Sequence, residues 1–227
     1  MERNLITDSN LIITLFLIHF VASLFAAELR NLKASVIAIA TQSFLLTLIL
    51  FTFAQLGPNP TLYWWGTTAL ITKVIIVPYL LWIYVRKLPA SEVKPYLGTV
   101  LSIIILLIMV VAFYTYIHAN VESIVPTLEA SSEPERTNLA LSLTICALGV
   151  YVLLIRKDVI KVIIGLILLE NGVHLSLVTL VPNLPETTLI GVVTNVIITI
   201  WLLLYLSGRI FMAFGTTDTS SLSQLKR

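Results

Sequence analysis

The stretch RKDVIKVIIGLILLENGVHLSLVTL, residues 156–180, decides the fold class of this protein. It opens on a basic pair and an acid, and from residue 159 it is almost wholly apolar. A helix needs roughly 20 such residues to cross about 30 Å of hydrocarbon. Three ionisable groups interrupt the run, namely Lys161, Glu170 and His174. The stretch therefore predicts a membrane-spanning helix that carries polar groups near its middle.

Similar runs recur along the whole chain. Its 227 residues are 58% hydrophobic and 11% charged, whereas a soluble domain is about 25% charged. This composition excludes a soluble enzyme and a nucleic-acid-binding protein. It predicts an all-α integral membrane protein with about seven transmembrane helices, because the runs are continuous rather than alternating. The seven runs lie at 11–27, 33–55, 62–85, 96–117, 137–155, 159–181 and 188–211.

Basic residues are sorted between the two sides of this arrangement. Of the fourteen Lys and Arg residues, ten lie on one side, whereas Arg3 and Arg136 lie on the other. Because cytoplasmic loops are enriched in Lys and Arg, the N-terminus is expected outside and the C-terminus in the cytoplasm. The ten are Arg30, Lys33, Arg86, Lys87, Lys94, Arg156, Lys157, Arg209, Lys226 and Arg227.

The longest connection divides the chain. It is acidic and separates four predicted helices from three. We therefore expect a four-helix N-terminal membrane part at 1–120, an acidic external loop at 121–136, a three-helix part at 137–214 and a cytoplasmic tail at 215–227. The leader MERNLITDSN lacks the positive region of a signal peptide, so the first run is expected to be a retained helix.

Soluble-site signatures are missing from the sequence. It has no phosphate-binding or dinucleotide loop and no HExxH. The single cysteine, Cys146, excludes a disulfide, a Cys-ligated zinc site or an iron–sulfur cluster held by this chain alone. The three histidines have no paired spacing, so no metal site is expected. Any chemistry must come from polar groups inside the helices.

Glu170 is the first candidate for such chemistry. A charge at mid-bilayer costs about 2.5–3.5 kcal/mol on insertion scales, so an intramembrane acid is by default a functional candidate. His174 lies four residues on, on the same helix face, and is a further candidate for proton transfer. Asn171 adds a donor and an acceptor beside them. We predict that Glu170 transfers protons; the alternative is a carboxylate that only pairs with a cation on a neighbouring helix.

Lys73 is the second candidate. It lies midway along the third run, with Pro78 five residues later. Desolvation shifts the pKa of a buried amine, so a lysine can also carry a proton. The alternative is a static ion pair, for example with Glu170.

Other polar residues are weaker candidates. Lys161 is expected to extend toward the aqueous interface, and His19 to make a hydrogen-bonded contact between helices. Gln42 and Asn195 are supporting polar residues, which join helices or orient water.

The quoted stretch resembles the middle helix of the three-helix K-type subunit of respiratory complex I. It is also similar to the C subunit of Mrp-type cation/proton antiporters. Both families have a basic pair, then a central Gly and an Asn, which here are Gly165 and Asn171. The longer pattern, with ITKVIIVPYLLWIYVRKLP at 71–89 and LENGVHL at 169–175, resembles the component E family of hydrogenase-4 over essentially the whole chain.

The resemblance implies a membrane-arm subunit without a redox centre of its own, and not an enzyme by itself. Its partners would be antiporter-like membrane subunits and peripheral subunits that carry nickel–iron and iron–sulfur centres. It would lie in the plasma (inner) membrane of a prokaryote and contribute to proton or sodium translocation coupled to electron transfer. The alternatives are a purely structural anchor of such a complex, or a C-type subunit of a cation/proton antiporter assembly.

Two positions depart from the family pattern. K-type subunits have their helix acid at the position of Ile167, one turn before Glu170. In the last helix, both K-type subunits and component E relatives tend to have an acid where this chain has Asn195, which cannot titrate. A relay through the seventh helix would therefore need water or another subunit.

Overall fold

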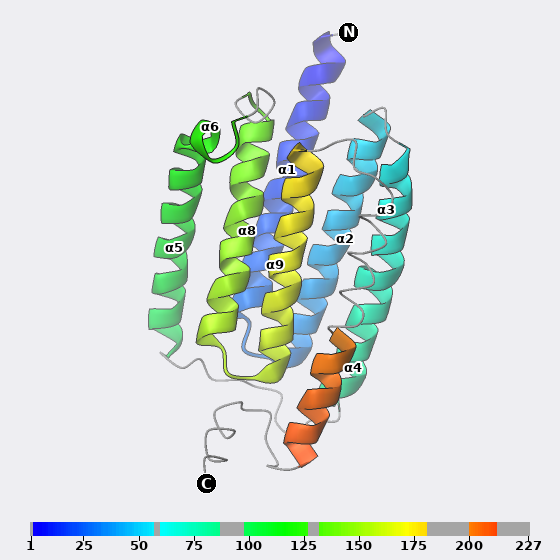
Figure 1. The fold of residues 1–227 in the computed structure, drawn as a ribbon, viewed down its shortest axis with the longest axis vertical. Coiled ribbons are helices and arrows are strands. Elements are labelled where there is room, and N and C mark those ends of the chain that lie inside the picture. The colour runs from blue at the N-terminus through cyan, green and yellow to red at the C-terminus, as the bar shows by residue number, and fades with distance from the viewer. Residues whose placement is uncertain (1, 57–59, 87–97, 127–131, 181–199, 213–227) are drawn as a thin grey trace.

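The computed structural model describes residues 2–56, 60–86, 98–126, 132–180 and 200–212, and its regular elements there are helices. Figure 1 shows the long helices standing side by side, with α5 at one edge and α3 and α4 at the other. The elements are α1 (Glu2–Glu28), α2 (Leu32–Leu56), α3 (Thr61–Ala69), η1 (Leu70–Ile76), α4 (Val77–Arg86), α5 (Thr99–Ala119), α6 (Val121–Ile124), α8 (Glu135–Ile155) and α9 (Val159–Leu180). A further apolar helix covers Ile200–Met212.

Six helices are long and apolar enough to cross a membrane, which confirms the first six predicted runs. They are Asn10–Glu28, Leu32–Leu56, Thr61–Arg86, Val100–Ala119, Glu135–Ile155 and Val159–Leu180. The seventh run is only partly described. Residues 200–211 form a helix that lies beside α4, whereas 188–199 and the tail at 215–227 lie outside the described residues.

Helical structure extends beyond the predicted runs at two places. The polar leader from Glu2 belongs to α1, and the acidic connection contains α6 and the first turn of α8. Apolar runs mark the part of a helix that faces hydrocarbon, whereas backbone hydrogen bonds continue through polar residues. The amide of Asn138, for example, donates to the carbonyl of Pro134 at 3.0 Å.

Local signals set the starts of α2 and α9. The Asn31 side chain accepts from the amides of Lys33 (2.9 Å) and Ala34 (3.3 Å). Asp158 does the same for Ile160 (2.9 Å) and Lys161 (3.4 Å). Both side chains satisfy amides that the first helical turn leaves without partners.

α3, η1 and α4 form one continuous helix with a π-helical segment at its centre. This segment, Leu70–Ile76, contains Lys73 and ends shortly before Pro78. The amide of Val77 donates to the carbonyl of Thr72, five residues back. Proline has no N–H for a regular i→i−4 bond, so the helical register changes next to it. Short π segments often occur at functional sites.

α8 and α9 form the tightest pair, because glycines let their backbones approach. A Cβ on Gly149 would lie 2.5 Å from the backbone nitrogen of Leu169, and one on Gly172 would lie 2.7 Å from Cys146 Sγ. Small residues at such contacts are the usual device by which membrane helices pack closely.

Candidate functional site

Lys73 is at the centre of a buried polar cluster. Its ammonium lies 2.9 Å from Glu170 Oε1 and 2.8 Å from Asn171 Oδ1, and it also contacts His174 Nδ1. A lysine ammonium has three N–H donors and no acceptor. The three donors therefore face three acceptors, all of them on α9.

α9 supplies these acceptors from one face, since Glu170, Asn171 and His174 lie at i, i+1 and i+4. Because Lys73 Nζ donates to His174 Nδ1, the ring hydrogen of His174 is assigned to Nε2. That atom lies 3.7 Å from Glu170 Oε1. The indole of Trp65 packs edge-on against the His174 ring, with 5.4 Å between ring centroids.

The cluster continues from Asn171 to α2 and α1. Asn171 Nδ2 donates to Gln42 Oε1 at 2.6 Å, and Gln42 Nε2 lies 2.9 Å from His19 Nε2. Ser43 and Ser23 flank this route: Asn171 Nδ2 is 3.5 Å from Ser43 Oγ, and Gln42 Nε2 is 3.2 Å from Ser23 Oγ. We call the residues Glu170, Lys73, His174, Asn171, Gln42 and His19 the central polar chain.

The central polar chain lies between two hydrophobic clusters. One contains Ala26, Val36, Val77 and Leu168, toward the end where α1 stops. The other contains Phe16, Leu46, Ala69 and Leu175. On α1, α2, the α3–η1–α4 helix and α9, the polar residues lie between members of the two clusters. The central polar chain therefore occupies one level inside the bundle.

The central polar chain is almost completely buried. His19, Gln42, Lys73, Asn171 and His174 are at most 3% exposed. The Glu170 side chain is 20% exposed, so it is the member that reaches the surface of the described bundle. Isolated charges at this depth would be very costly, which is why each must have a partner.

Five of the residues that the sequence singled out come together here: Glu170, Lys73, His174, Asn171 and Gln42. Asn195 lies outside the described residues. His19 makes the hydrogen-bonded contact between helices that we expected. The sequence analysis missed Ser23, Ser43 and Trp65, because their residue types are common in membrane helices and only the packing of four segments assembles them.

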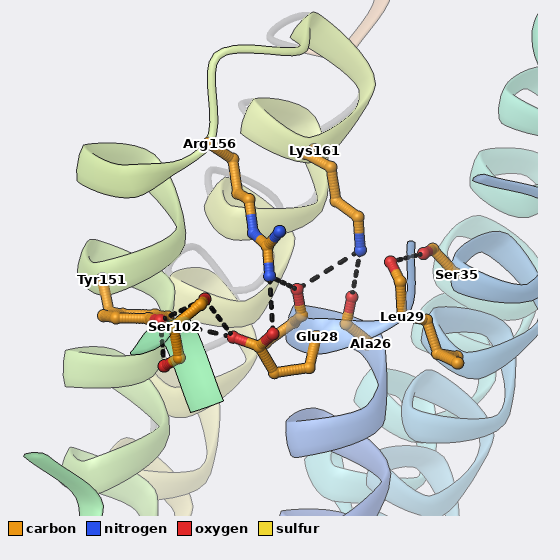
Figure 2. A network of polar contacts seen from close by, with 9 residues as sticks. Ala26, Glu28, Leu29, Ser35, Ser102, Tyr151, Arg156 and Lys161 are labelled. Atoms are coloured by element: carbon orange, nitrogen blue, oxygen red, sulfur yellow. Dashed lines mark hydrogen bonds and ion pairs between the residues drawn. The ribbon is translucent and has the colours of Figure 1, made fainter. Parts of the chain in front are cut away.

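A second polar network joins the end of α1 to α5 and α8. Arg156 Nη2 donates to Glu28 Oε2 at 2.8 Å, and Ser102 Oγ donates to Glu28 Oε1 at 3.0 Å (Figure 2). The Tyr151 hydroxyl donates to the carbonyl of Ser102 at 2.8 Å. The sequence assigned these residues to loops and apolar runs and did not predict the network.

Lys161 belongs to this second network, and our expectation that it extends to the interface is wrong. It is 0% exposed, and its ammonium donates to the carbonyls of Ala26 (3.0 Å) and Ala27 (3.3 Å), as Figure 2 shows for Ala26. These carbonyls end α1, where the helix dipole favours a cation. The partial negative charge of that helix end stabilises the amine inside the protein.

Within the described residues, no group of three His, Cys, Asp or Glu side chains is placed to hold a metal ion. The central polar chain is instead suited to hydrogen bonding and proton exchange, because it combines an acid, an amine and two imidazoles.

Comparisons with known proteins agree with the length and the C-terminal pattern. The chain is 27% identical to hydrogenase-4 component E from Escherichia coli K12 over 220 residues, which are 97% of this chain and 99% of that protein. The same figures hold for the proteins of that name from E. coli O157:H7 and Shigella flexneri. Residues 138–227 match the family NADH-ubiquinone/plastoquinone oxidoreductase chain 4L. No solved structure gives a significant match.

The chain 4L match begins in α8 and includes α9, which supplies Glu170, Asn171 and His174. The match to component E also covers the segment with Lys73. The protein is thus a homologue of hydrogenase-4 component E with a C-terminal chain 4L domain.

Proposed function

We propose that this protein is a non-redox membrane subunit of a hydrogenase or complex I-like oxidoreductase, and that it contributes to proton translocation coupled to electron transfer. The observation that supports this most directly is the Lys73–Glu170 pair, with 2.9 Å between Nζ and Oε1 inside the bundle. Its homology to component E and its chain 4L domain support the kind of complex.

The distance between Lys73 Nζ and Glu170 Oε1 is short enough for a proton transfer. An ammonium and a carboxylate at hydrogen-bond distance can exchange one proton and become an amine and a carboxylic acid. Burial disfavours the charged form of each partner, while their attraction favours the charged pair. These effects oppose each other, so a modest change in a neighbouring subunit can shift the balance.

The two partners have different access. Glu170 is partly exposed, whereas Lys73 is buried at 3%. We assign Glu170 as the group that takes up the proton and Lys73 as its partner or next carrier. His174 and Asn171 hold the ammonium in place through Nδ1 and Oδ1. Asn195 is proposed to orient water.

We further propose seven spans, with the N-terminus outside and the C-terminus in the cytoplasm of a prokaryotic inner membrane. The ends of α1 and α8 and the start of α9 lie on the same side of the bundle in Figure 1, and they carry Arg30, Arg156 and Lys157. This clustering supports a cytoplasmic side there. The external loop at 121–136 would separate the four-helix part from the three-helix part at 137–214.

Other subunits supply the redox chemistry in this proposal. Nickel–iron and iron–sulfur centres lie on peripheral partners, and antiporter-like subunits adjoin this chain in the membrane. The proposal also has a form for sodium. In it, the Glu170 carboxylate binds a sodium ion directly instead of exchanging a proton.

Replacement of Glu170 by Gln tests the relay. In the complete complex, reconstituted in vesicles, Glu170→Gln should abolish proton translocation and leave electron transfer to a soluble acceptor intact, because the amide cannot exchange a proton. Glu122→Gln, which changes an exposed acid outside the spans, is the matched control. Undiminished pumping by Glu170→Gln would reject the relay.

A structural anchor is the second candidate function, and the ion pair itself favours it, because a buried pair also fixes packing. The exchange variant Lys73→Glu/Glu170→Lys separates the two. An anchor keeps assembly and pumping after the exchange, since the pair is still formed. A relay keeps assembly at best and loses pumping, because the acid is no longer at the accessible position.

A further inference from the structure

From Lys73 through Asn171 and Gln42 to His19, the hydrogen bonds of the central polar chain run in one direction. Lys73 has only donors, so Asn171 must turn its oxygen toward it and its nitrogen toward Gln42. Gln42 accepts with Oε1 and therefore presents its nitrogen to His19 Nε2 at 2.9 Å. Nε2 must then be an unprotonated acceptor, and the ring hydrogen is assigned to Nδ1.

The reverse direction also pairs both amide groups of the central polar chain, and it imposes a different state on Lys73. Nδ1 of His19 has no hydrogen-bond partner among the described residues in either direction. If Nε2 of His19 carries a hydrogen, Gln42 must rotate its oxygen toward the ring and its nitrogen toward Asn171. Asn171 must then rotate its oxygen to Gln42 and its nitrogen to Lys73. Only a neutral amine can accept from that nitrogen, because an ammonium has no lone pair.

Two serines fit both directions. Ser23 Oγ accepts from Gln42 Nε2 at 3.2 Å and donates to the carbonyl of His19 at 2.9 Å. Ser43 Oγ lies 3.5 Å from Asn171 Nδ2. A hydroxyl both donates and accepts, so each serine can turn its hydrogen toward an amide oxygen after the rotation. Neither direction leaves an amide group of the chain without a partner.

We propose that His19 is a second proton-binding residue, and that Nε2 is protonated only when Lys73 is a neutral amine. This rests on the proposed relay. The proton that leaves Lys73 Nζ passes to the Glu170 carboxylate. The proton that binds His19 Nε2 arrives from water, and the amides of Asn171 and Gln42 rotate without exchanging protons. Nδ1 keeps its hydrogen, so protonation of Nε2 makes His19 an imidazolium. The two sites thus hold a positive charge in alternation, on α1 and on η1.

Nitrogen NMR of the complete complex tests this, with ¹⁵N-histidine and ¹⁵N-lysine labels in this chain. The His19 and Lys73 signals are assigned by their loss in His19→Gln and Lys73→Met. In the resting wild-type protein, Lys73 should be an ammonium and His19 should carry its hydrogen on Nδ1, with about a tenfold or greater excess over the other tautomer. A protonated Nε2 beside a Lys73 ammonium in the wild-type protein would overturn the proposal.

Two variants test the connection. Gln42→Met interrupts the hydrogen bonds of the central polar chain. Lys73→Met removes the donor that sets the direction of these bonds. Both should populate the Nε2–H form of His19 several-fold more than wild type does. Thr47→Val is the matched control, because it removes a buried polar group of α2 that, among the described residues, bonds to the Ser43 carbonyl of its own helix. An Nε2–H population of His19 that is unchanged in both variants would contradict the coupling.

The two proposals fail separately. If Glu170→Gln pumps normally but His19 follows Lys73, the relay is wrong and the coupling stands. If Glu170→Gln stops pumping but the Nε2–H population of His19 does not change in Lys73→Met and Gln42→Met, the relay stands and the coupling is wrong.

Discussion

Arg156 Nη2 lies 2.8 Å from Glu28 Oε2, and this ion pair ties the α8–α9 connection to the end of α1. The arginine side chain is fully buried, and the carboxylate is 17% exposed. Loss of one partner would leave a buried charge unpaired. We predict that Glu28→Gln lowers the free energy of unfolding by about 3 kcal/mol, at the low end of the range because Glu28 keeps some solvent.

Denaturant titration of the purified chain in mild detergent measures this effect. Lys33→Gln changes an exposed charge near the same helix end and should be within about 0.5 kcal/mol of wild type. If Glu28→Gln were no less stable than Lys33→Gln, the ion pair would not stabilise this end of the bundle.

The close approach of α8 and α9 gives a second prediction, at Gly172. A Cβ there would lie 2.7 Å from both the nitrogen and the Sγ of Cys146. Gly172→Ala should force the helices apart and lower the melting temperature, at a cost of about 1–3 kcal/mol.

Gly208→Ala is the matched control for this substitution. Among the described residues, its new Cβ would meet nothing nearer than Tyr84 at 3.9 Å, so it should be neutral or stabilising by up to about 1 kcal/mol. Equal melting temperatures for the two variants would show that α8 and α9 do not need the glycine.

The fold was largely predictable from sequence because each membrane-spanning helix is a continuous apolar run. The apolar run at 159–181 predicts α9 to within a residue, since nothing but a helix satisfies its backbone in hydrocarbon. The π segment around Lys73 was not predicted. The run at 62–85 predicted one helix through Pro78, but not the π-helical register that precedes the proline.

The charged residues were the most predictable part of the site. Glu170 and Lys73 stand out by their cost in a membrane, whereas His19 and Ser23 gain their meaning from the packing of α1 against α2. Lys161 shows that the position of a residue along a predicted span does not decide whether its side chain reaches the aqueous interface. Its position near a helix end suggests an interfacial amine, but the carbonyls of Ala26 and Ala27, far away in sequence, hold it inside.

A third prediction separates stability from transport at the Lys73–Glu170 pair. Lys73→Met leaves the Glu170 carboxylate without its ammonium and should destabilise the protein by about 3 kcal/mol. The double variant Lys73→Met/Glu170→Leu removes both charges and should recover most of that loss, because apolar side chains of similar volume replace a buried pair at little cost.

Transport should not recover with stability. The double variant has no titratable pair, so vesicles that contain the complex should show no proton translocation. Measurement of unfolding and pumping on the same preparations checks both. Pumping by the stable double variant would assign the pair a structural role.

The fourth prediction concerns pH and the connection before α8. Partial burial raises the pKa of Glu133, but hydrogen bonds with Thr137 and His118 outweigh it and lower the pKa overall from the ordinary 4.5. A carboxyl with a lowered folded-state pKa stabilises the fold above its unfolded pKa, and this contribution disappears as the pH falls through the folded value. Protection of the Thr137 amide, which donates to Glu133 Oε2 at 3.3 Å, should therefore decline below about pH 4.5.

Hydrogen exchange, corrected for the intrinsic rate at each pH, measures this protection. The effect should be small, about 1 kcal/mol or less, because Glu133 is 52% exposed. The Asn138 amide is the internal control: it donates to the carbonyl of Pro134, so acid should leave it protected. Glu133→Gln should reduce Thr137 protection at neutral pH and remove its acid dependence. If both amides lost protection together in wild type, the whole helix start would be opening, and Glu133 would not be the responsible group.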